Sequence, residues 1–273
     1  MPTVYIGTAQ FAAGLLRHLV AAGEAPALVV TMPDRPAGRG RKLTAPPVAD
    51  VARELAIELV QPEDINDPAG LELIASAEPN ALLVCAYGAL IREPLLSSYE
   101  ILNVHPSLLP RWRGAAPIER AMIAGDAETG VSIMRLVEGL DCGPVCAAVR
   151  EPIRADDTFG SLSERLELRG AELLIEAIRT PRPFVDQEES AATYAEKITA
   201  DDRILGPESS AEEQERRVRA LAPHIGARVE LDDGTMLGVR SAHLEGGELF
   251  YDEVVPPGSR PMSWDEFQRG RSE

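Results

Sequence analysis

The first residues of the chain alternate between short apolar runs and segments in which apolar residues recur every three or four positions. Thr3–Ile6 is a β-branched and aromatic run that ends at Gly7, which is typical of a buried strand. The next apolar residues are spaced as on one face of a helix: Phe11, Leu15, Leu16, Leu19 and Val20. Ala27–Thr31 is a second continuous apolar run. The order strand, helix, strand predicts a parallel sheet joined by right-handed crossovers.

The alternation continues and predicts an α/β fold with a doubly wound, mostly parallel sheet. The most apolar strand candidate is Ala81–Ala86. The other expected elements are helices at 47–56 and 67–75, strands at 59–60, 101–105, 129–136 and 145–149, and a long helix capped at 156–158. The glycine pattern G-x-G-x-x-G is missing where Gly7-Thr8 follows the first strand, so no dinucleotide site is predicted.

The pattern changes near the carboxyl end. A helical segment at 211–222 is followed by short strand candidates at 227–231, 236–239 and 248–251, with turn signals at Asp232-Asp233-Gly234 and Gly246-Gly247. These predict a small β-barrel. We therefore expect an amino-terminal domain at residues 1–182, a linker at 183–200 and a small domain at 201–273.

The composition is that of an ordinary globular protein, with 45% hydrophobic and 26% charged residues. No apolar run approaches the ~18 residues of a membrane span and no leader is evident, so we expect a cytoplasmic protein without a membrane partner. Cys85, Cys142 and Cys146 are odd in number and lack zinc-site spacing. Free thiols and no metal are predicted.

The net charge of −17 argues against a protein that binds nucleic acid over its whole surface. From residue 200 onward, 9 arginines face 16 acidic residues. The stretch from Met32 to Pro47 is the exception, with Gly and Pro that oppose regular structure and four cations: Arg35, Arg39, Arg41 and Lys42. Such a stretch is usually a solvated surface loop, and otherwise a local RNA contact.

The candidate chemistry lies in Asn103-Val104-His105. Two residues apart on a strand, Asn103 and His105 project to the same face, where an amide and an imidazole suit a carbonyl oxygen that gains negative charge. A lone His at a strand end is more often simply packed or solvated. Downstream, Asp141 lies in a glycine-bounded loop that could hold a carboxylate in place, although an ordinary turn residue is the default interpretation of an Asp between glycines.

Other residues could line a ligand slot beside this pair. Leu108-Leu109-Pro110 predicts an apolar wall with a fixed turn, and Arg111, Trp112 and Arg113 offer two cations and a flat ring to an anionic ligand. Tyr87-Gly88 follows the most apolar strand, at the sheet edge where open α/β sheets bind ligands. A core-edge tyrosine with its hydroxyl in water is the other interpretation of Tyr87.

On these motifs the chain resembles the formyltransferases that use 10-formyltetrahydrofolate, in particular those that act on methionyl-tRNA. The similarity rests on Asn103-x-His105, the Ser107–Pro110 run and Gly139-Leu140-Asp141-Cys142-Gly143, where the family has Thr or Ser at the Cys142 position. The basic stretch resembles the family's inserted finger that contacts the tRNA acceptor end. The carboxyl-terminal piece resembles the family's OB-like tail, apart from Ala222–Gly226, where the family has a Pro-aromatic-Pro-Gly turn.

The resemblance implies a formyltransferase fold followed by an OB-like barrel, and formyl transfer to the α-amine of initiator methionyl-tRNA. It implies three catalytic residues, Asn103, His105 and Asp141. It also implies a folate slot and a tRNA contact: Ser107, Leu108, Leu109, Pro110, Tyr87 and Gly88 for the folate, and Arg35, Arg39, Arg41 and Lys42 for the tRNA. We expect a monomer, with 10-formyltetrahydrofolate as co-substrate.

Three alternatives stay open at this point. The same residues would serve a formyltransferase acting on an amino sugar or a ribonucleotide amine. A folate deformylase would use water in place of the amine. A folate or RNA binder without catalytic activity would not need Asp141.

Overall fold

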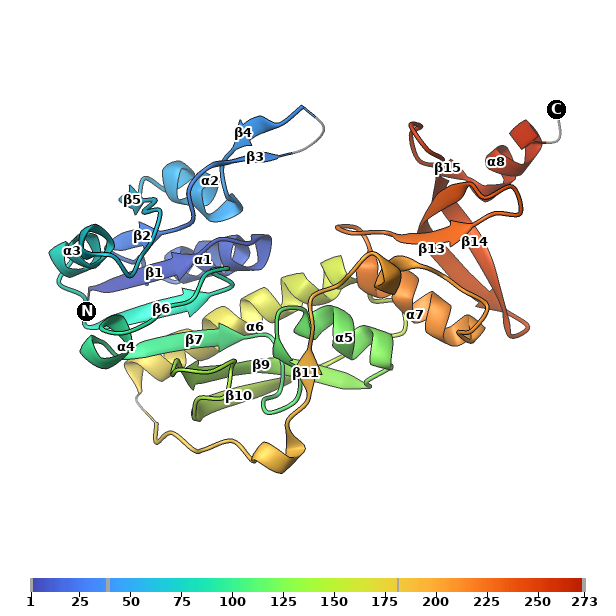
Figure 1. Cartoon of the computed structure of the whole chain (residues 1–273). Coiled ribbons are helices and arrows are strands. Elements are labelled where there is room, and N and C mark those ends of the chain that lie inside the picture. Colours follow the sequence, from blue (N-terminus) through green and yellow to red (C-terminus); the bar gives the residue numbers. More distant parts are fainter. Residues whose placement is uncertain (1, 38–39, 181, 272–273) are drawn as a thin grey trace. The chain divides into compact units, whose positions relative to one another are not determined.

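The computed structural model of the protein describes residues 2–37, 40–180 and 182–271 (Figure 1). The chain divides into two compact units. The first comprises Met1–Arg113, Gly130–Arg150 and Glu164–Thr193, and the second comprises Gly114–Thr129, Glu151–Ser163 and Tyr194–Glu273. The predicted domain boundaries at residues 182 and 200 stay a prediction.

A seven-stranded sheet forms the centre of the first unit, in the order β10-β9-β7-β6-β1-β2-β5. Its strands are β1 (Thr3–Gly7), β2 (Leu28–Val30), β5 (Leu59–Val60), β6 (Ala81–Cys85), β7 (Ile101–His105), β9 (Glu128–Arg135) and β10 (Val145–Pro152). The pairs β1–β2, β1–β6, β2–β5 and β6–β7 are parallel, whereas β9 runs antiparallel to β7. The predicted mostly parallel sheet is therefore confirmed.

The strand order reverses between β1 and β6. From β1 the chain builds outward to β2 and β5, and it then returns to add β6 and β7 on the other side. The backbone N–H groups of Thr8 and Ala9 donate to the Ala86 carbonyl, which ties together the chain segments that follow β1 and β6. Open α/β sheets bind their ligands outside the carboxyl ends of the strands at such a switch point.

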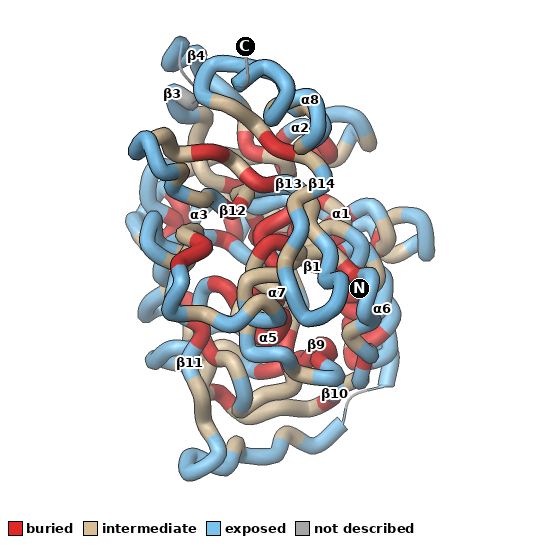
Figure 2. The backbone as a smooth tube through the Cα atoms, turned by 90° about the vertical axis from the view of Figure 1, so that its right-hand side faces the viewer, coloured by how far each residue is buried: buried red, intermediate tan, exposed pale blue. Residues whose placement is uncertain are grey.

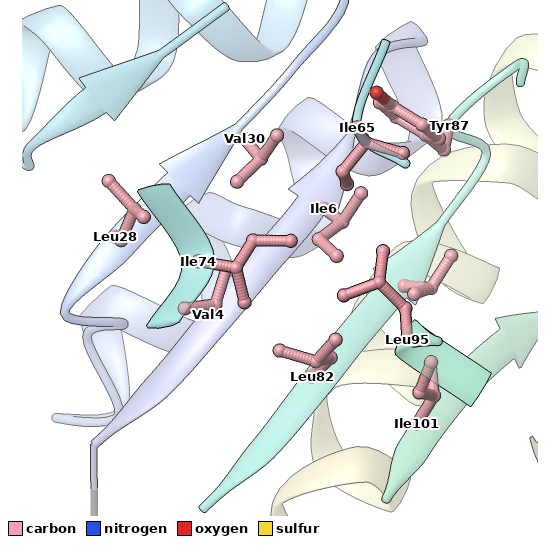
Figure 3. Close-up of a cluster of buried hydrophobic side chains, with 11 residues drawn as sticks. Val4, Ile6, Leu28, Val30, Ile65, Ile74, Leu82, Tyr87, Leu95 and Ile101 are labelled. Atoms are coloured by element: carbon pink, nitrogen blue, oxygen red, sulfur yellow. The ribbon is translucent and has the colours of Figure 1, made fainter. Parts of the chain in front are cut away.

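Helices cover both faces of this sheet because successive strand residues point to opposite sides. Val4 and Ile6 pack with residues of α3 (Pro68–Ser76) and α4 (Leu95–Ser98) in a buried apolar cluster (Figure 3). Tyr5 points the other way, and its hydroxyl donates to the Ala12 carbonyl of α1 (Gln10–Ala21) at 2.7 Å. Helix α6 (Phe159–Arg179) approaches on this face so closely that a Cβ on Gly170 would lie 3.1 Å from Val104 Cγ1.

The basic stretch after β2 contains a two-stranded hairpin, β3 (Arg35–Ala37) with β4 (Lys42–Thr44). The prediction that residues 32–47 lack regular structure is therefore wrong in part. Antiparallel pairing satisfies the backbone groups while the charged side chains stay in water, so glycine and proline nearby do not prevent it. The hairpin is exposed (Figure 2), and helix α2 (Pro47–Glu54) follows it.

In the second unit, α5 (Pro117–Ala124) packs on α7 (Ala211–Leu221), and α7 packs on an antiparallel sheet in the order β12-β13-β14-β15. Those strands are Ala227–Glu230, Met236–Glu245, Glu248–Val255 and Met262–Ser263, and α8 (Trp264–Arg271) follows them. The core consists of Leu205, Val218, Leu221, Ala227 and Val239. The predicted β strands at the carboxyl end are confirmed, and β13 and β14 are longer than expected.

Short elements complete the chain. The strand β8 (Arg113–Gly114) pairs with β11 (Tyr194–Ala195), and 3-10 helices lie at Glu189–Ala191 and Asp201–Arg203. Within the described residues, no helix combines the length and the apolar character needed to cross a membrane.

Candidate active site

Asn103 and His105 lie at the carboxyl end of β7, one of the central strands. Both are buried, with 7% and 4% of their surface exposed. In the register, Asn103 lies opposite Val84 on one side and Met134 on the other, and His105 lies opposite Ser132. Their spacing of two along an extended strand directs both side chains to one face of the sheet. The described residues offer no hydrogen bond to the Asn103 amide, so it can still bind a ligand.

The hydrogen bonds of His105 determine which ring nitrogen carries the proton. Nε2 lies 2.8 Å from the Trp112 carbonyl oxygen, which can only accept, so Nε2 carries the hydrogen. Nδ1 faces the Asp141 carboxylate, with Oδ2 at 3.7 Å. The neutral ring therefore presents an unprotonated nitrogen toward Asp141, and this pair can receive a proton from a substrate.

The turn after β7 is held by two buried serines. The Ser107 hydroxyl donates to the Arg111 carbonyl at 2.6 Å. The Ser132 hydroxyl donates to the Ser107 carbonyl at 2.8 Å and accepts from the Leu109 N–H at 3.1 Å. This network shapes the turn that carries the Trp112 carbonyl to His105. Ser107, which was predicted to contact folate, is fully buried with its hydroxyl engaged inside the turn.

Asp141 lies in a loop whose backbone is unusual. Its φ of +47° is in the left-handed region, where residues other than glycine are uncommon. A Cβ on the nearby Gly143 would lie 1.9 Å from the Arg135 carbonyl, so only glycine fits there. The Cys142 thiol lies 3.8 Å from the Glu138 carbonyl, a weak contact where the family's hydroxyl would bond more strongly.

Leu109 and Pro110 line a cleft of about 330 Å³ in the first unit, whose other walls are residues 145–148 of β10 and residues 185–188. Leu108 does not line this cleft. It packs against Gly130, so closely that a Cβ on that glycine would lie 2.6 Å from Leu108 Cδ2. Of the three residues of the predicted apolar wall, Leu109 and Pro110 therefore line the cleft, and the half-buried Leu108 packs against Gly130.

Tyr87 belongs to the apolar cluster of Figure 3, beside Ile65. Its burial, with a smaller contribution from the Asp64 carboxylate, raises the pKa of its hydroxyl to about 12. Gly88, which follows, has a φ of +86° and open space where a side chain would stand. The structure thus favours a core role for the Tyr87 ring and leaves Gly88 as the open backbone position of the pair.

The two arginines beside Trp112 have different surroundings. The Arg111 guanidinium lies over the Trp112 ring, 4.4 Å from its centroid. Arg113 is buried, and it donates to Gln187 Oε1 at 3.0 Å and to both carboxylate oxygens of Glu189 at 3.1 and 2.9 Å. The expectation that Arg113 meets an anionic ligand is therefore wrong, because the carboxylate of Glu189 in the same chain pairs with it.

Three of the four predicted tRNA contacts lie on the β3–β4 hairpin. Arg35, Arg41 and Lys42 are exposed, and Leu43 beside them is 70% exposed. Arg39 lies outside the described residues. No hydrogen bond or ion pair between described residues joins Arg35, Arg41 or Lys42 to Asn103, His105 or Asp141.

Two residues that sequence analysis missed hold the site together. Gln187 donates from Nε2 to the carbonyls of Asp141 and Gly143, at 2.8 and 2.7 Å. The Thr193 hydroxyl accepts from the Trp112 N–H at 2.9 Å. Both lie in the stretch expected to be a linker, where no apolar pattern indicated contact with the sheet.

A model of the formyl transferase family matches residues 3–178 of the chain. The chain belongs to the formyl transferase family. Methionyl-tRNA formyltransferases of Halorhodospira halophila and Methylococcus capsulatus are 41% and 40% identical to it, and each alignment covers 98% of this chain and 96% of the relative.

Solved structures of formyl transferases are similar to this chain in fold. The methionyl-tRNA formyltransferase from Clostridium thermocellum has a TM-score of 0.65 at 14% identity, over 94% of this chain and 100% of that one. A sugar N-formyltransferase from a Shewanella species has a TM-score of 0.66 at 16% identity, over 90% of this chain and 99% of that one. At this identity the two likenesses support the fold alone, so they do not choose between an amino sugar and a tRNA as acceptor.

Proposed function

We propose that this protein transfers the formyl group of 10-formyltetrahydrofolate to the α-amine of methionyl-tRNA. The observation that carries the proposal is the arrangement of Asn103, His105 and Asp141 at the carboxyl edge of the sheet, in a chain whose full-length relatives are methionyl-tRNA formyltransferases. An amide, an imidazole and a carboxylate in this order are suited to direct transfer of an acyl group between two nitrogen atoms.

Asn103 and His105 would stabilise charge on the formyl oxygen. When the amine attacks the formyl carbon, that oxygen gains negative charge. The Asn103 amide can donate to it from the same strand face as His105. His105 can donate from Nδ1 once that nitrogen has taken up the proton that the amine loses, since Nε2 is held by Trp112. Removing one donor of this kind typically costs about 3 kcal/mol of transition-state stabilisation.

Asp141 and His105 would carry the proton. The attacking amine must lose one proton, and the N10 nitrogen of the folate must gain one when its bond to the formyl carbon breaks. Nδ1 of His105 and Oδ2 of Asp141, 3.7 Å apart, face each other and can take up that proton and return it. The transfer leaves no covalent intermediate on the protein.

The remaining site residues would bind the two substrates. The cleft lined by Leu109 and Pro110 offers an apolar wall for the flat folate ring. Gly88, which follows β6, leaves open space where a ligand can approach the backbone. The exposed cations of the β3–β4 hairpin offer phosphate contacts to the tRNA acceptor end, which an amino sugar would not require.

The test is incubation of the protein with 10-formyltetrahydrofolate and one acceptor at a time: methionyl-tRNA, free methionine, an amino sugar nucleotide or water alone. We expect formylmethionyl-tRNA, detected by mass spectrometry after hydrolysis of the ester bond, and little product with the other acceptors. Faster turnover of an amino sugar, or release of formate without any acceptor, would contradict the proposal.

A further inference from the structure

Both partners of the His105 ring are held by one short segment, Gln187–Thr193. At its start, Gln187 donates to the carbonyls of Asp141 and Gly143, which lie on either side of Cys142. At its end, the Thr193 hydroxyl accepts from Trp112, whose carbonyl accepts from Nε2 of His105. The segment therefore contacts both Asp141, whose carboxylate faces Nδ1 of His105, and Trp112, whose carbonyl fixes the tautomer of the ring.

The segment is itself anchored to the first unit. Val185, just before it, exchanges two backbone hydrogen bonds of 2.9 Å with Val145 of β10. At the far end, the Thr193 N–H donates to the Pro110 carbonyl, and the Thr193 carbonyl accepts from the Arg113 N–H. Figure 1 shows the chain leaving α6 and running past β10 toward β11.

The orientation of the Gln187 amide follows from its neighbours. Arg113 can only donate, so the Gln187 oxygen must face it, and Nε of Arg113 lies 3.0 Å from that oxygen. The two backbone carbonyls can only accept, so the NH₂ group must face them. Arg113 also forms an ion pair with Glu189 of the same segment. The Arg113 side chain is almost fully buried and that of Glu189 is largely exposed.

The backbone conformation of the loop around Asp141 is stabilised by hydrogen bonds from outside the loop. The left-handed backbone at Asp141 is uncommon outside glycine, although Asp tolerates it better than most residues, and surrounding contacts help to hold it. Gln187 supplies two hydrogen bonds to that backbone from a single side chain. Gln187 is also half-buried, whereas its neighbours at 185, 186, 188 and 189 are exposed.

We propose that Gln187 is the positioning residue of this site, holding the Asp141 carboxylate opposite Nδ1 of His105, with Arg113 and Glu189 fixing its orientation. This inference rests on the proposed formyl transfer, because it assigns Gln187 to the proton-carrying pair of that reaction. Gln187 does not touch the reacting atoms. Its effect passes through Asp141 and should therefore appear in kcat.

The first measurement compares kcat and KM of the wild type, Gln187→Ala and Gln214→Ala with methionyl-tRNA. Gln214 is a matched control in the second unit, since its amide donates to two backbone carbonyls, those of Gly206 and Ser209, at 3.1 and 3.0 Å. We expect Gln187→Ala to lower kcat on the order of 10²-fold, as small displacements of catalytic groups do. The KM for methionyl-tRNA and the KM for 10-formyltetrahydrofolate should change little. Gln214→Ala should retain the wild-type kcat.

A double-mutant cycle with Asp141→Asn separates positioning from general loss of structure. If Gln187 acts through Asp141, adding Gln187→Ala to Asp141→Asn should cost far less than it costs in the wild type. Additive losses would overturn the inference, and so would a Gln187→Ala variant with an unchanged kcat. A wild type that forms no formylmethionyl-tRNA would instead overturn the proposed function.

Two further readouts guard against a variant that merely folds poorly. Gln187→Glu places carboxylate oxygens against the two carbonyls, so its kcat relative to wild type should recover as pH falls and the Glu side chain becomes a donor. A crystal structure of Gln187→Ala should show Asp141 Oδ2 displaced from Nδ1 of His105. An unmoved carboxylate would contradict the inference whatever the activity.

Discussion

The Trp112 carbonyl oxygen lies 2.8 Å from Nε2 of His105. Because this contact occupies Nε2, only Nδ1 of the imidazole can exchange a proton with a substrate or with Asp141. Trp112 itself has a φ of +63°, so the residues on both sides of the ring, Trp112 and Asp141, have left-handed backbones. Such conformations are concentrated at functional sites. Here the Trp112 carbonyl faces Nε2 of His105, and the Asp141 carboxylate faces Nδ1 of the same ring.

This geometry leads to a prediction for Asp141 and His105. Asp141→Asn removes the charge that faces Nδ1, and His105→Ala removes the ring, so each should lower kcat by at least about two orders of magnitude, the equivalent of about 3 kcal/mol. Folate binding, measured by fluorescence quenching or calorimetry, should persist because neither change removes the slot. Near-wild-type turnover by either variant would show that the site is assigned wrongly.

Cys142 provides a second prediction, since it stands next to Asp141 where the family has Thr or Ser. Its thiol contact with Glu138 is weak, worth less than about 1 kcal/mol, so Cys142→Ser should keep nearly full activity. Treating the wild type with a small alkylating reagent should block turnover, because the adduct sits beside the carboxylate.

The other two thiols should not confuse this measurement. Cys85 is fully buried, and burial raises the pKa of the Cys146 thiol, which leaves less of the reactive thiolate. Peptide mass spectrometry would show which cysteine is modified. Equal loss of activity in the alkylated Cys142→Ser variant would contradict this account.

The sequence was informative where a local pattern determines structure. Apolar runs predicted the strands, and a spacing of two placed Asn103 and His105 on one face, because a strand has a fixed period. The hairpin at 35–44 was missed because its strands carry charges and proline instead of an alternating apolar pattern. Two strands that pair while both faces stay in water show no alternation of apolar and polar residues in the sequence.

Gln187 and Arg113 could not have been found in the same way. Gln187 reaches back 46 positions to Asp141, and Arg113 reaches forward 76 positions to Glu189. Such contacts depend on how the folded chain returns to the sheet, and no period along the sequence encodes them. A polar stretch without an apolar period is read as a linker for the same reason, although here its amide and hydroxyl groups support the site.

A third prediction concerns stability in the second unit, where Asp202 accepts from Arg120 at 2.7 and 2.9 Å. The Arg120 guanidinium lowers the pKa of the Asp202 carboxyl to about 2, helped by hydrogen bonds from Thr199. A carboxyl whose pKa is depressed on folding stabilises the folded state above its unfolded pKa of about 3.9, and that contribution is lost as pH falls toward 2.

Asp202→Asn should therefore lower the free energy of unfolding by about 1–2 kcal/mol at pH 7, after allowing for solvent screening of a partly exposed pair. The difference from the wild type should shrink as the pH falls from about 4 to 2. Urea titrations at several pH values would measure it. A difference that stays constant over this range would show that charge is not the source. Arg240→Ala, which removes an exposed pair with Glu253 in the same unit, is the control and should change little.

The last prediction concerns the acceptor. Arg41 and Lys42 are exposed on a hairpin whose described residues bury almost no apolar surface, so folding alone does not require these cations there. The double variant Arg41→Ala, Lys42→Ala should fold normally and bind folate as the wild type does. It should raise KM for methionyl-tRNA, and each lost phosphate contact should reduce the slope of log affinity against log salt by roughly one.

A second double variant controls for the loss of positive charge as such. Arg17 and Arg179 are exposed cations paired with Glu54 and Glu24, so replacing both with Ala changes the net charge equally. If the hairpin contacts tRNA directly, the Arg17→Ala, Arg179→Ala variant should keep the wild-type KM and salt slope. If both double variants weaken tRNA binding equally, the effect is one of overall charge and the hairpin is not the contact. If neither does, the acceptor end is bound elsewhere on the protein.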